Sequence, residues 1–409
     1  MSNWTLVKLG DICTISKGEQ LNRIDLEDEG EYPCINGGIS PSGFTENWNT
    51  EANTITISEG GNSCGYISFQ RKRFWSGGHC YSLLELKNNV FNDFLFQALK
   101  GNESSIMSLR VGSGLPNIQQ KAIRNFEIFI PESNSEQRQI AKILSTADAV
   151  IEKTQAAIAK YKAIKQGMLH DLFTRGIDIK TGKLRPTYKD APELYKPSKL
   201  GMVPKDWDVE EINKIGEVIS GATPSTSVKE FWDGDIVWIT PADLSKQKES
   251  IYFQTAARKI SELGLISCSA NLIDKNNLVI SSRAPIGYLS IIKSSFTTNQ
   301  GCKSIRFYKN QVPEYYYYNL LLNVERLKTF GEGTTFAEIS KADLDIFNVV
   351  VCDKEEQKLI SAKLLTIDNN ITTEQNYLQK LQQLKSGLMG DLLSGRKKVK
   401  VKDGLKEKV

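Results

Sequence analysis

Basic side chains beside aromatic rings give this sequence its first candidates for contact with nucleic acid. The segment QRKRFW, residues 70–75, holds Arg71, Lys72 and Arg73 in succession. Lysine and arginine neutralise phosphates, and arginine also pairs with the major-groove edge of guanine. A solvated hairpin loop is an equally good interpretation of this segment, and the sequence alone leaves both open.

Further candidates lie next to tight turns, where a backbone can approach a duplex closely. Arg110 precedes a turn at Gly112 and Gly114, and Arg283 precedes the segment APIGY. Hydroxyl and amide side chains elsewhere in the chain are able to reach phosphates or base edges. These further candidates are Thr223, Ser225, Thr226, Thr298, Asn299 and Gln300.

Motifs that would indicate catalysis are incomplete. The methyltransferase pattern of an acidic residue or asparagine before Pro-Pro-aromatic is missing, because the sequence has no Pro-Pro. Residues 176–184 (GIDIKTGKL) depart from a phosphate-binding loop in their glycine spacing and in having Leu184 where Ser or Thr belongs. Residues 353–358 resemble a nuclease Asp…Glu-x-Lys set, but Glu356 fits a helix cap better. His79 has no carboxylate or second histidine near it in sequence, which favours a structural role.

Composition is typical of a cytoplasmic globular protein with two or three domains. Of the 409 residues 40% are apolar and 24% are charged. We find no apolar run long enough for a membrane span and no secretory signal at the N-terminus. Seven cysteines without a C-x-x-C pair and only two histidines argue against a disulfide framework or a metal site. We therefore expect no metal and no cofactor in this chain.

The net charge of +4 comes from the C-terminal end of the chain. Residues 394–409 carry +5, which leaves −1 for residues 1–393. Bulk charge therefore does not indicate a nucleic-acid binder, and any DNA contact must come from local patches or from a partner. A disordered solubilising end is the favoured interpretation of this basic tail.

The chain repeats itself in order, which indicates a tandem duplication. Residues 4–18 align with residues 207–221 at an offset of 203, and EQRQIAKIL at 136–144 aligns with EQKLISAKL at 356–364 at an offset of 220. Between them, CYSLLEL at Cys80 matches CKSIRFY at Cys302, and GSGLPNI at Gly112 matches GEGTTFAEI at Gly331. Each copy therefore contains a globular part followed by a long helix.

The globular parts are predicted to mix strands and helices. The segments 53–58, 126–131, 277–282 and 347–352 are rich in β-branched and aromatic residues, which is typical of strands. Helices are predicted at 92–100 and 313–327. The four tyrosines at 315–318 fit a packed amphipathic helix better than a base-stacking surface, because they align with the segment DFLF of the first copy.

The two long helices, predicted at 136–173 and 356–393, carry an apolar heptad stripe. SNSE and DKEE, at 133–136 and 353–356, have the capping-box signature at their starts. The predicted helix-pair interface is Ile140, Leu144, Ile151, Ile158, Tyr161, Met168 and Leu172 on the first helix, and Ile360, Leu364, Ile371, Leu378, Leu381, Leu388 and Leu392 on the second. Polar residues interrupt both stripes, at Thr154 and Lys165 and at Glu374 and Lys385. Polar residues in such stripes commonly fix register.

Each predicted helix would be about 57 Å long at the usual rise per residue, longer than a small domain is wide. A stripe of that length needs a partner stripe, and we expect the two helices to pack against each other. The connector at 176–203 is rich in proline and is predicted to be extended and wrapped. The residues alone leave open whether the helices run parallel or antiparallel.

Several segments together closely resemble the specificity subunits of type I restriction–modification systems. The resemblance covers nearly the whole chain, although the first half departs in wording at YPCINGGISPSGF and SEGGNSCGY. The segments that carry it are GATPSTSVKEFWDGDIVWITPADL at 221–244, TNQGCKSI at 298–305, GSGLPNIQQ at 112–120, YKPSKLGMVPKDW at 195–207 and LKSGLMGDLL at 384–393.

The resemblance implies an α+β fold in which two mixed α/β target recognition domains are joined by two long antiparallel helices that form a coiled coil, as a pseudo-twofold tandem repeat. The implied domains are recognition domains at 1–132 and 204–352, spacer helices at 133–175 and 353–395, a connector at 176–203 and a basic tail at 396–409.

It also implies a non-catalytic subunit that reads a bipartite, asymmetric target in double-stranded DNA. The helix pair would act as a ruler and as a docking surface for two modification subunits, which carry S-adenosylmethionine and methylate adenine at N6. Restriction subunits that use ATP and Mg²⁺ would join them. Two alternatives remain: a self-contained DNA methyltransferase or nuclease of the same system, and a coiled-coil scaffold that does not read DNA.

Overall fold

The computed structural model describes residues 3–112, 114–247, 250–283, 285–331 and 338–400. Four predicted features therefore lie partly outside the described residues: the turn at Gly112 and Gly114, the segment APIGY at 284–288, the segment GEGTTFAEI at 331–339 and the basic tail at 396–409. The chain forms two compact units, which we call the first unit (residues 1–156 and 375–409) and the second unit (residues 157–374). Each unit takes part of both long helices.

The first unit contains two main sheets. The four-stranded sheet has the order β2-β8-β5-β6, the three-stranded sheet has the order β4-β3-β7, and β1 pairs with β9. The elements are β1 (Trp4–Lys8), α1 (Leu9–Ile12), β2 (Thr14–Lys17), η1 (Arg23–Asp25), β3 (Tyr32–Ile35), β4 (Phe44–Thr45), β5 (Thr54–Ser58), β6 (Ile67–Gln70), β7 (Trp75–Ser76), β8 (Cys80–Leu84), α2 (Asn92–Gly101), α3 (Glu103–Met107), α4 (Gln120–Arg124), β9 (Glu127–Pro131) and parts of α5 (Asn134–Thr174) and α12 (Lys354–Leu392).

The second unit repeats this arrangement. Its four-stranded sheet has the order β13-β19-β16-β17, its three-stranded sheet β15-β14-β18, and β12 pairs with β20. Its elements, besides parts of α5 and α12, are η2 (Pro192–Leu194), β10 (Tyr195–Ser198), β11 (Gly201–Pro204), β12 (Asp208–Glu211), α6 (Ile212–Ile215), β13 (Gly216–Ser220), η3 (Lys229–Phe231), β14 (Trp232–Ile239), α7 (Pro241–Lys246), β15 (Arg258–Ile260), α8 (Glu262–Ile266), β16 (Asn277–Ser281), β17 (Leu289–Ile292), β18 (Phe296–Thr298), β19 (Cys302–Phe307), α9 (Pro313–Leu322), α10 (Val324–Phe330), α11 (Lys341–Asp345) and β20 (Asn348–Val351).

The match between the units extends to strand direction. In each three-stranded sheet the central strand, β3 or β14, pairs antiparallel with one neighbour and parallel with the other. The tandem duplication inferred from sequence is therefore confirmed at the level of topology. The four strands predicted at 53–58, 126–131, 277–282 and 347–352 are also confirmed, as β5, β9, β16 and β20.

The tyrosines at 315–318 lie in α9 and are packed, as predicted. All four are buried, so the helix is enclosed on every side instead of being amphipathic. The Tyr315 hydroxyl donates to the carbonyl of Val350 and the Tyr318 hydroxyl donates to Asp368, at 3.1 and 2.6 Å. Burial, reinforced by the Asp368 charge, raises the pKa of Tyr318. The predicted helix at 313–327 is divided at Asn323 into α9 and α10.

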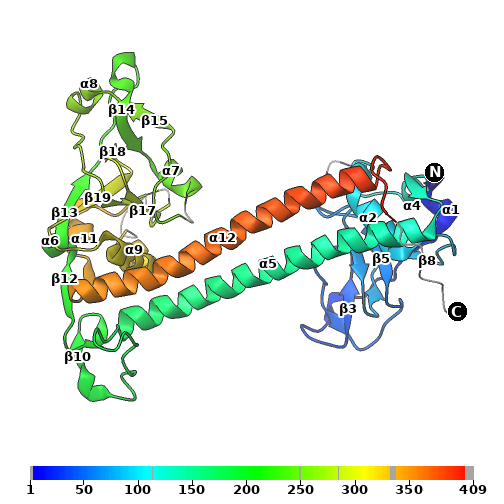
Figure 1. The fold of residues 1–409 in the computed structure, drawn as a ribbon, viewed down its shortest axis with the longest axis horizontal. Coiled ribbons are helices and arrows are strands. Elements are labelled where there is room, and N and C mark those ends of the chain that lie inside the picture. The colour runs from blue at the N-terminus through cyan, green and yellow to red at the C-terminus, as the bar shows by residue number, and fades with distance from the viewer. Residues whose placement is uncertain (1–2, 113, 248–249, 284, 332–337, 401–409) are drawn as a thin grey trace. The chain divides into compact units, whose positions relative to one another are not determined.

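The long helices run antiparallel within each unit (Figure 1). In the first unit Ile140 and Leu144, near the start of α5, share one core cluster with Leu392, at the end of α12. In the second unit Leu172, near the end of α5, shares a cluster with Ile360, near the start of α12. The antiparallel arrangement implied by the resemblance is therefore confirmed.

The lysines that interrupt the apolar stripes form ion pairs between the two helices. In the first unit Lys385 of α12 pairs with Asp148 of α5. In the second unit Lys165 of α5 pairs with Asp368 of α12 at 2.6 Å. Both aspartates sit at the same position of the repeat, at an offset of 220. A charged pair inside an apolar stripe is satisfied in only one register, so these pairs specify the helix alignment.

Ser133 and Asp353 both cap their helices as predicted, but the return bond from Glu356 that would complete a capping box at α12 is not formed. The Ser133 hydroxyl accepts a hydrogen bond from the amide of Glu136 at 3.3 Å, as expected for α5. At the start of α12, Asp353 instead accepts from the amide of Glu355 at 2.8 Å. The Glu356 carboxylate does not accept from the amide at the helix start, because it accepts hydrogen bonds from Ile177 and Arg185 of the connector instead.

Candidate nucleic-acid interface

Each unit carries a loop directly after the first strand of its four-stranded sheet. We call residues 18–22 the first loop and residues 221–228 the second loop. Both begin with a glycine that lies against another backbone. A β-carbon on Gly18 or Gly221 would lie 2.2 Å from a carbonyl oxygen, so only glycine fits at these positions.

The residue after each glycine is bound to the three-stranded sheet. The amide of Glu19 donates to the carbonyl of Ser76 at 2.8 Å, and the amide of Ala222 donates to the carbonyl of Thr298 at 2.9 Å. Each loop therefore leaves the four-stranded sheet and is immediately attached to the end of a strand in the smaller sheet.

Several of the candidate residues predicted from sequence meet beside the second loop. The Thr223 hydroxyl donates to the side-chain oxygen of Gln300. Asn299 accepts from the amide of Gly301 at 3.0 Å, which shapes the turn between β18 and β19. Thr298 is buried and contributes its carbonyl to the loop attachment.

The remaining hydroxyl candidates are exposed on the second loop. Ser225 and Thr226 both face solvent, and the Ser225 and Ser227 hydroxyls lie 2.8 Å apart in a hydrogen bond. The backbone here is ordered by local hydrogen bonds while the hydroxyls point outward, an arrangement that can present donors and acceptors to a ligand.

Arg283 belongs to a charged cluster that the sequence did not reveal. Its guanidinium lies 3.6 Å from Glu338, and the ammonium of Lys303 lies 3.6 Å from the other oxygen of the same carboxylate. The Lys303 side chain is only 7% exposed and also donates to the carbonyl of Gln300 at 3.4 Å. A buried cation next to the second loop is thereby neutralised in part by one acid.

The first unit has an acidic counterpart at the same edge of its four-stranded sheet. Glu59 accepts from Lys17 at 2.6 Å and from the Tyr81 hydroxyl at 3.1 Å, and His79 Nδ1 lies 3.3 Å away. Burial disfavours the ionised carboxylate, but the hydrogen bonds from Lys17 and Tyr81 outweigh it and hold the pKa of Glu59 below its ordinary value. His79 thus has the carboxylate neighbour that its sequence context lacked.

The basic segment at 70–75 forms the turn between β6 and β7. Arg71 pairs with Asp93 at 2.8 Å and lies over the Phe69 ring, while Arg73 pairs with Glu51 at 3.0 Å. Lys72 is exposed between them. The two arginines remain 57% and 49% exposed, so their outward edges are open to a further anion.

Arg110 lies at the foot of a small hairpin in the first unit. Val111 and Asn117 exchange backbone hydrogen bonds of 2.8 and 3.0 Å, which closes the hairpin next to exposed Arg110. The predicted turn at Gly112 and Gly114 lies within it, and residue 113 is outside the described residues.

The predicted helix-pair residues differ in burial along the helices. Buried and half-buried positions both occur near the ends and towards the middle of each helix. The buried ones are Ile140, Leu144, Ile158, Leu172, Ile360, Leu364, Ile371 and Leu392, and the half-buried ones are Ile151, Tyr161, Met168, Leu378, Leu381 and Leu388.

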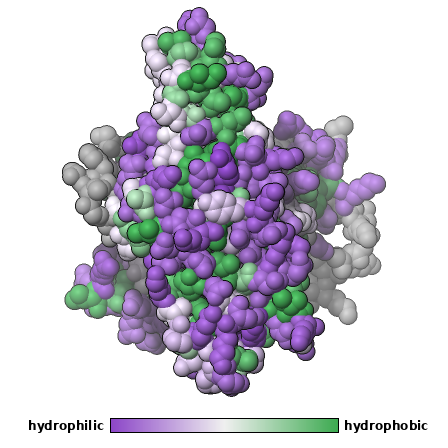
Figure 2. All heavy atoms as spheres, turned by 90° about the vertical axis from the view of Figure 1, so that its left-hand side faces the viewer, coloured by the Kyte–Doolittle hydropathy of each residue, from purple (hydrophilic) through white to green (hydrophobic). Residues whose placement is uncertain are grey.

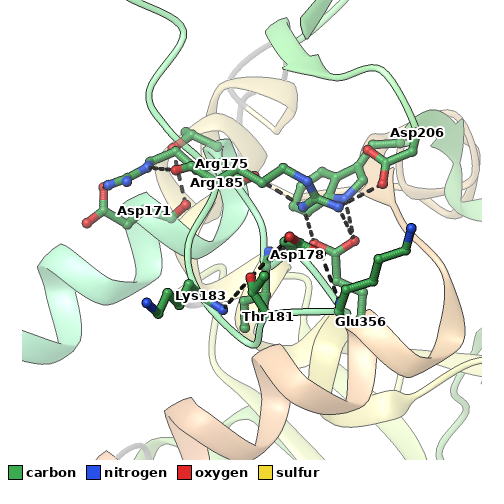
Figure 3. Close-up of polar contacts among 12 residues, drawn as sticks. Asp171, Arg175, Asp178, Thr181, Lys183, Arg185, Asp206 and Glu356 are labelled. Carbon is green, nitrogen blue, oxygen red and sulfur yellow. Dashed lines mark hydrogen bonds and ion pairs between the residues drawn. The ribbon is translucent and has the colours of Figure 1, made fainter. Parts of the chain in front are cut away.

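The connector is held by a buried carboxylate (Figure 3). Glu356, 1% exposed, accepts from Arg185 at 3.0 Å, from the Trp207 indole at 3.0 Å and from the Ile177 amide at 2.6 Å. Burial alone would lower the pKa of Arg185, but the charges of Glu356 and Asp206 outweigh it and raise that pKa. The first glutamate of the repeated phrase therefore attaches the connector to the start of α12.

The cysteine thiols and the possible metal ligands offer little further chemistry among the described residues. All seven cysteines are free thiols, and burial raises the pKa of Cys80 to about 11, which keeps it protonated at neutral pH. The described residues contain no cluster of histidine, cysteine and carboxylate side chains suited to a metal ion. Nor do they include a helix both long and apolar enough to cross a membrane.

One of the places where apolar side chains gather on the surface of the second unit is formed by β14 and α8. Figure 2 shows them over β14 and α8, and the most exposed are Leu263 and Ile266, the latter 80% exposed. Around this tip the surface is mostly polar (Figure 2).

Comparison with known proteins identifies the family. The family model described as "Type I restriction modification DNA specificity domain" matches residues 1–161 and 204–383. The MjaVIII specificity subunit of Methanocaldococcus jannaschii is 26% identical over 97% of this chain and 94% of its own length. The MjaIX specificity subunit of the same organism is 39% identical, over 46% of this chain and 44% of its own length.

A solved structure shares the fold. The S subunit of a type I restriction–modification system from M. genitalium superposes with a TM-score of 0.68, covering 96% of each chain at 20% identity. This chain therefore belongs to the family of type I restriction–modification DNA specificity subunits, and it contains two copies of the specificity domain.

Proposed function

We propose that this chain reads a bipartite, asymmetric DNA sequence for a type I restriction–modification complex, with one half-site assigned to each unit. The observation that carries the proposal is that the two units repeat the same pair of sheets but differ in the residues at the sheet edges. Base sequence is read by side chains at base edges, so two scaffolds with different edge residues suit two different half-sites. We assign the recognition domains to residues 1–132 and 204–352.

The chemistry of the complex belongs to its partners in this proposal. Two modification subunits would bind S-adenosylmethionine and methylate adenine at N6, and restriction subunits would use ATP and Mg²⁺. The relatives support this, because they are named as specificity subunits of restriction enzymes. A complex that acts on chromosomal DNA would work in the cytoplasm.

Incubation with labelled S-adenosylmethionine and double-stranded DNA tests this division of labour. The purified chain alone should transfer no label, and adding the modification subunit encoded with it should start transfer to adenine. Transfer by the chain alone would favour the alternative of a self-contained methyltransferase. A complex that methylates without sequence preference would favour the alternative of a scaffold that does not read DNA.

We propose that the DNA contacts come from the residues of and beside the second loop, from Arg110 and from the basic turn of the first unit. The exposure of the basic turn and of the second-loop hydroxyls supports this assignment. The proposed contacts are Arg71, Lys72, Arg73, Arg110, Thr223, Ser225, Thr226, Arg283, Asn299 and Gln300, whereas Thr298, predicted from the sequence, is buried and is not proposed as a contact.

We also propose that α5 and α12 set the distance between the half-sites. Adding one heptad to both helices extends each by about 10 Å, which corresponds to roughly 1–3 additional unread base pairs. The insertions keep the apolar stripes in phase, so the variant retains its helix pair. Methylation at the original spacing would contradict the spacer role, while an unpaired insertion in α5 alone serves as the control for mere disruption.

A further inference from the structure

The first and second loops are each anchored at the same backbone carbonyl by a tryptophan indole. The Trp75 indole N–H donates to the carbonyl of Glu19 at 2.8 Å. The Trp238 indole N–H donates to the carbonyl of Ala222 at 3.0 Å. Glu19 and Ala222 are equivalent residues, because each follows the glycine that starts its loop at the repeat offset of 203.

The two tryptophans themselves are not equivalent in the repeat. Trp75 lies on the edge strand β7, opposite Cys34 of the central strand β3. Trp238 lies on the central strand β14, opposite Thr297 of β18. The indole thus comes from one strand in the first unit and from its parallel neighbour in the second. Since the donor has changed strands while the anchored carbonyl is the same, the position of the loop is the feature that the two units have in common.

The second loop has an additional indole anchor. The Trp232 indole N–H donates to the carbonyl of Ser225 at 3.0 Å. The Trp232 and Trp238 rings pack edge to face with centroids 5.0 Å apart, and Arg258 lies over the Trp232 ring. The Trp232 and Trp238 side chains are both buried, so their N–H donors are held in fixed positions.

The side chains that the anchors leave outside differ between the loops. The first loop exposes Glu19, Gln20 and Asn22, which offer a carboxylate and two amides. The second loop exposes hydroxyls at Ser225 and Thr226. Amides suit adenine, carboxylates suit cytosine and hydroxyls suit several base edges, so the two loops are fitted to different sequences.

We propose that the first and second loops are the specificity-determining segments of their half-sites, and that Trp75 and Trp238 are the residues that position them. This inference rests on the proposed function. Base readout requires donors and acceptors held at hydrogen-bond distance from the base edges. A loop that is fixed before it binds loses less conformational freedom on contact and tolerates fewer alternative bases.

Single substitutions that remove the indole N–H, and with it part of the ring, test the proposal in the complex with the modification subunit. Trp238→Phe keeps an aromatic ring against Trp232 but releases the Ala222 carbonyl. The measurement is the ratio of methylation rates on the cognate duplex and on duplexes with one base changed in one half-site. We expect Trp238→Phe to lower this ratio about 2- to 10-fold for one half-site and to leave the other unchanged. Trp75→Phe should give the reverse pattern.

Trp207→Phe is the matched control, because it also removes an indole hydrogen bond from the second unit, at buried Glu356. It should lower the melting temperature and leave base discrimination at both half-sites unchanged. If Trp207→Phe relaxes discrimination as much as Trp238→Phe does, the effect is general destabilisation and the positioning role is wrong.

A surface variant covers the case in which Trp238→Phe folds poorly. Ser225, Thr226 and Ser227 are exposed, so their combined replacement by alanine should leave the melting temperature unchanged. It should change base preference at the same half-site that Trp238→Phe affects. Unchanged preference in this variant would overturn the inference. If the unmodified complex shows no bipartite preference, the proposed function fails instead, so the two failures are distinguishable.

Discussion

The two units have groups of opposite charge at corresponding strand ends of their four-stranded sheets. In the first unit the central group is Glu59, which lies beyond the end of β5 and gathers Lys17, His79 and Tyr81. In the second unit it is Lys303, at the register position of β19 that Tyr81 occupies in β8, and it faces Glu338.

This difference shows which parts of the repeated fold are constrained. The faces of both four-stranded sheets that pack into the cores carry branched aliphatic side chains, since close packing tolerates little change in volume. The sheet edge is partly open to water, so its polar groups need only satisfy one another. Duplication followed by divergence at this edge yields two surfaces of different electrostatic character on one scaffold.

Removing the ion pair that holds the connector, which is found at Glu356 of the second unit, should have the largest effect on unfolding free energy. Arg185→Met leaves the buried Glu356 carboxylate without its cation, which costs about 3–5 kcal/mol of unfolding free energy. Urea unfolding measures the loss. Arg175→Met, at the residue just before the connector, removes an i,i+4 pair with Asp171 and a hydrogen bond to the carbonyl of Arg185, and should cost no more than about 2 kcal/mol. Equal losses in the two variants would show that Glu356 is satisfied without Arg185.

Removing the ion pairs between the long helices should lower the unfolding free energy by similar amounts in the two units. Lys385→Met in the first unit and Lys165→Met in the second each remove a partly buried cation from an aspartate, at about 1–3 kcal/mol. Because the two sites are related by the repeat, the losses should agree to within about 1 kcal/mol. Exchanging the charges, with Asp148→Lys and Lys385→Asp together, should recover part of the first loss. No recovery would mean that the pair does not specify register.

The basic turn of the first unit should affect binding without affecting sequence preference. Replacing Arg71, Lys72 and Arg73 together by alanine should weaken binding to every duplex, because phosphate contacts carry no sequence information. The slope of log affinity against log salt concentration should fall by about one for each phosphate that the variant no longer neutralises. An unchanged slope would assign the turn to solvent.

Acid should affect the first unit through Glu59. Its pKa is below the ordinary value of 4.5 in the folded chain, so its ionised form stabilises the fold above that pH. This contribution is lost as the pH falls from 4.5 through the folded-state pKa. Glu59→Gln should therefore make the melting temperature less sensitive to pH in this window.

Local periodicity was sufficient to predict the long helices and the repeat. The heptad spacing of apolar residues is itself evidence for a helix. The polar positions Lys165 and Lys385 also indicated where the register between the two helices would be set. The packed tyrosines were predictable because the aligned segment in the first copy is apolar.

The polar clusters were not predictable, because their members are brought together only by strand order. Glu59 and Lys17 lie far apart in sequence and meet because the ends of β5 and β2 lie at one sheet edge. Arg185 and Glu356 are separated by 171 residues, and no local pattern links one to the other. The tryptophan anchors were hidden for a further reason: Trp75 and Trp238 do not align, so comparing the two copies residue by residue does not match them.

Mapping N6-methyladenine across the genome of cells that carry this chain and its modification subunit tests most directly whether two different readers share one chain. The account predicts a two-part motif with unrelated halves, an unread spacer of constant length and one methylated adenine in each half, on opposite strands. A single uninterrupted motif, or two identical halves, would contradict it.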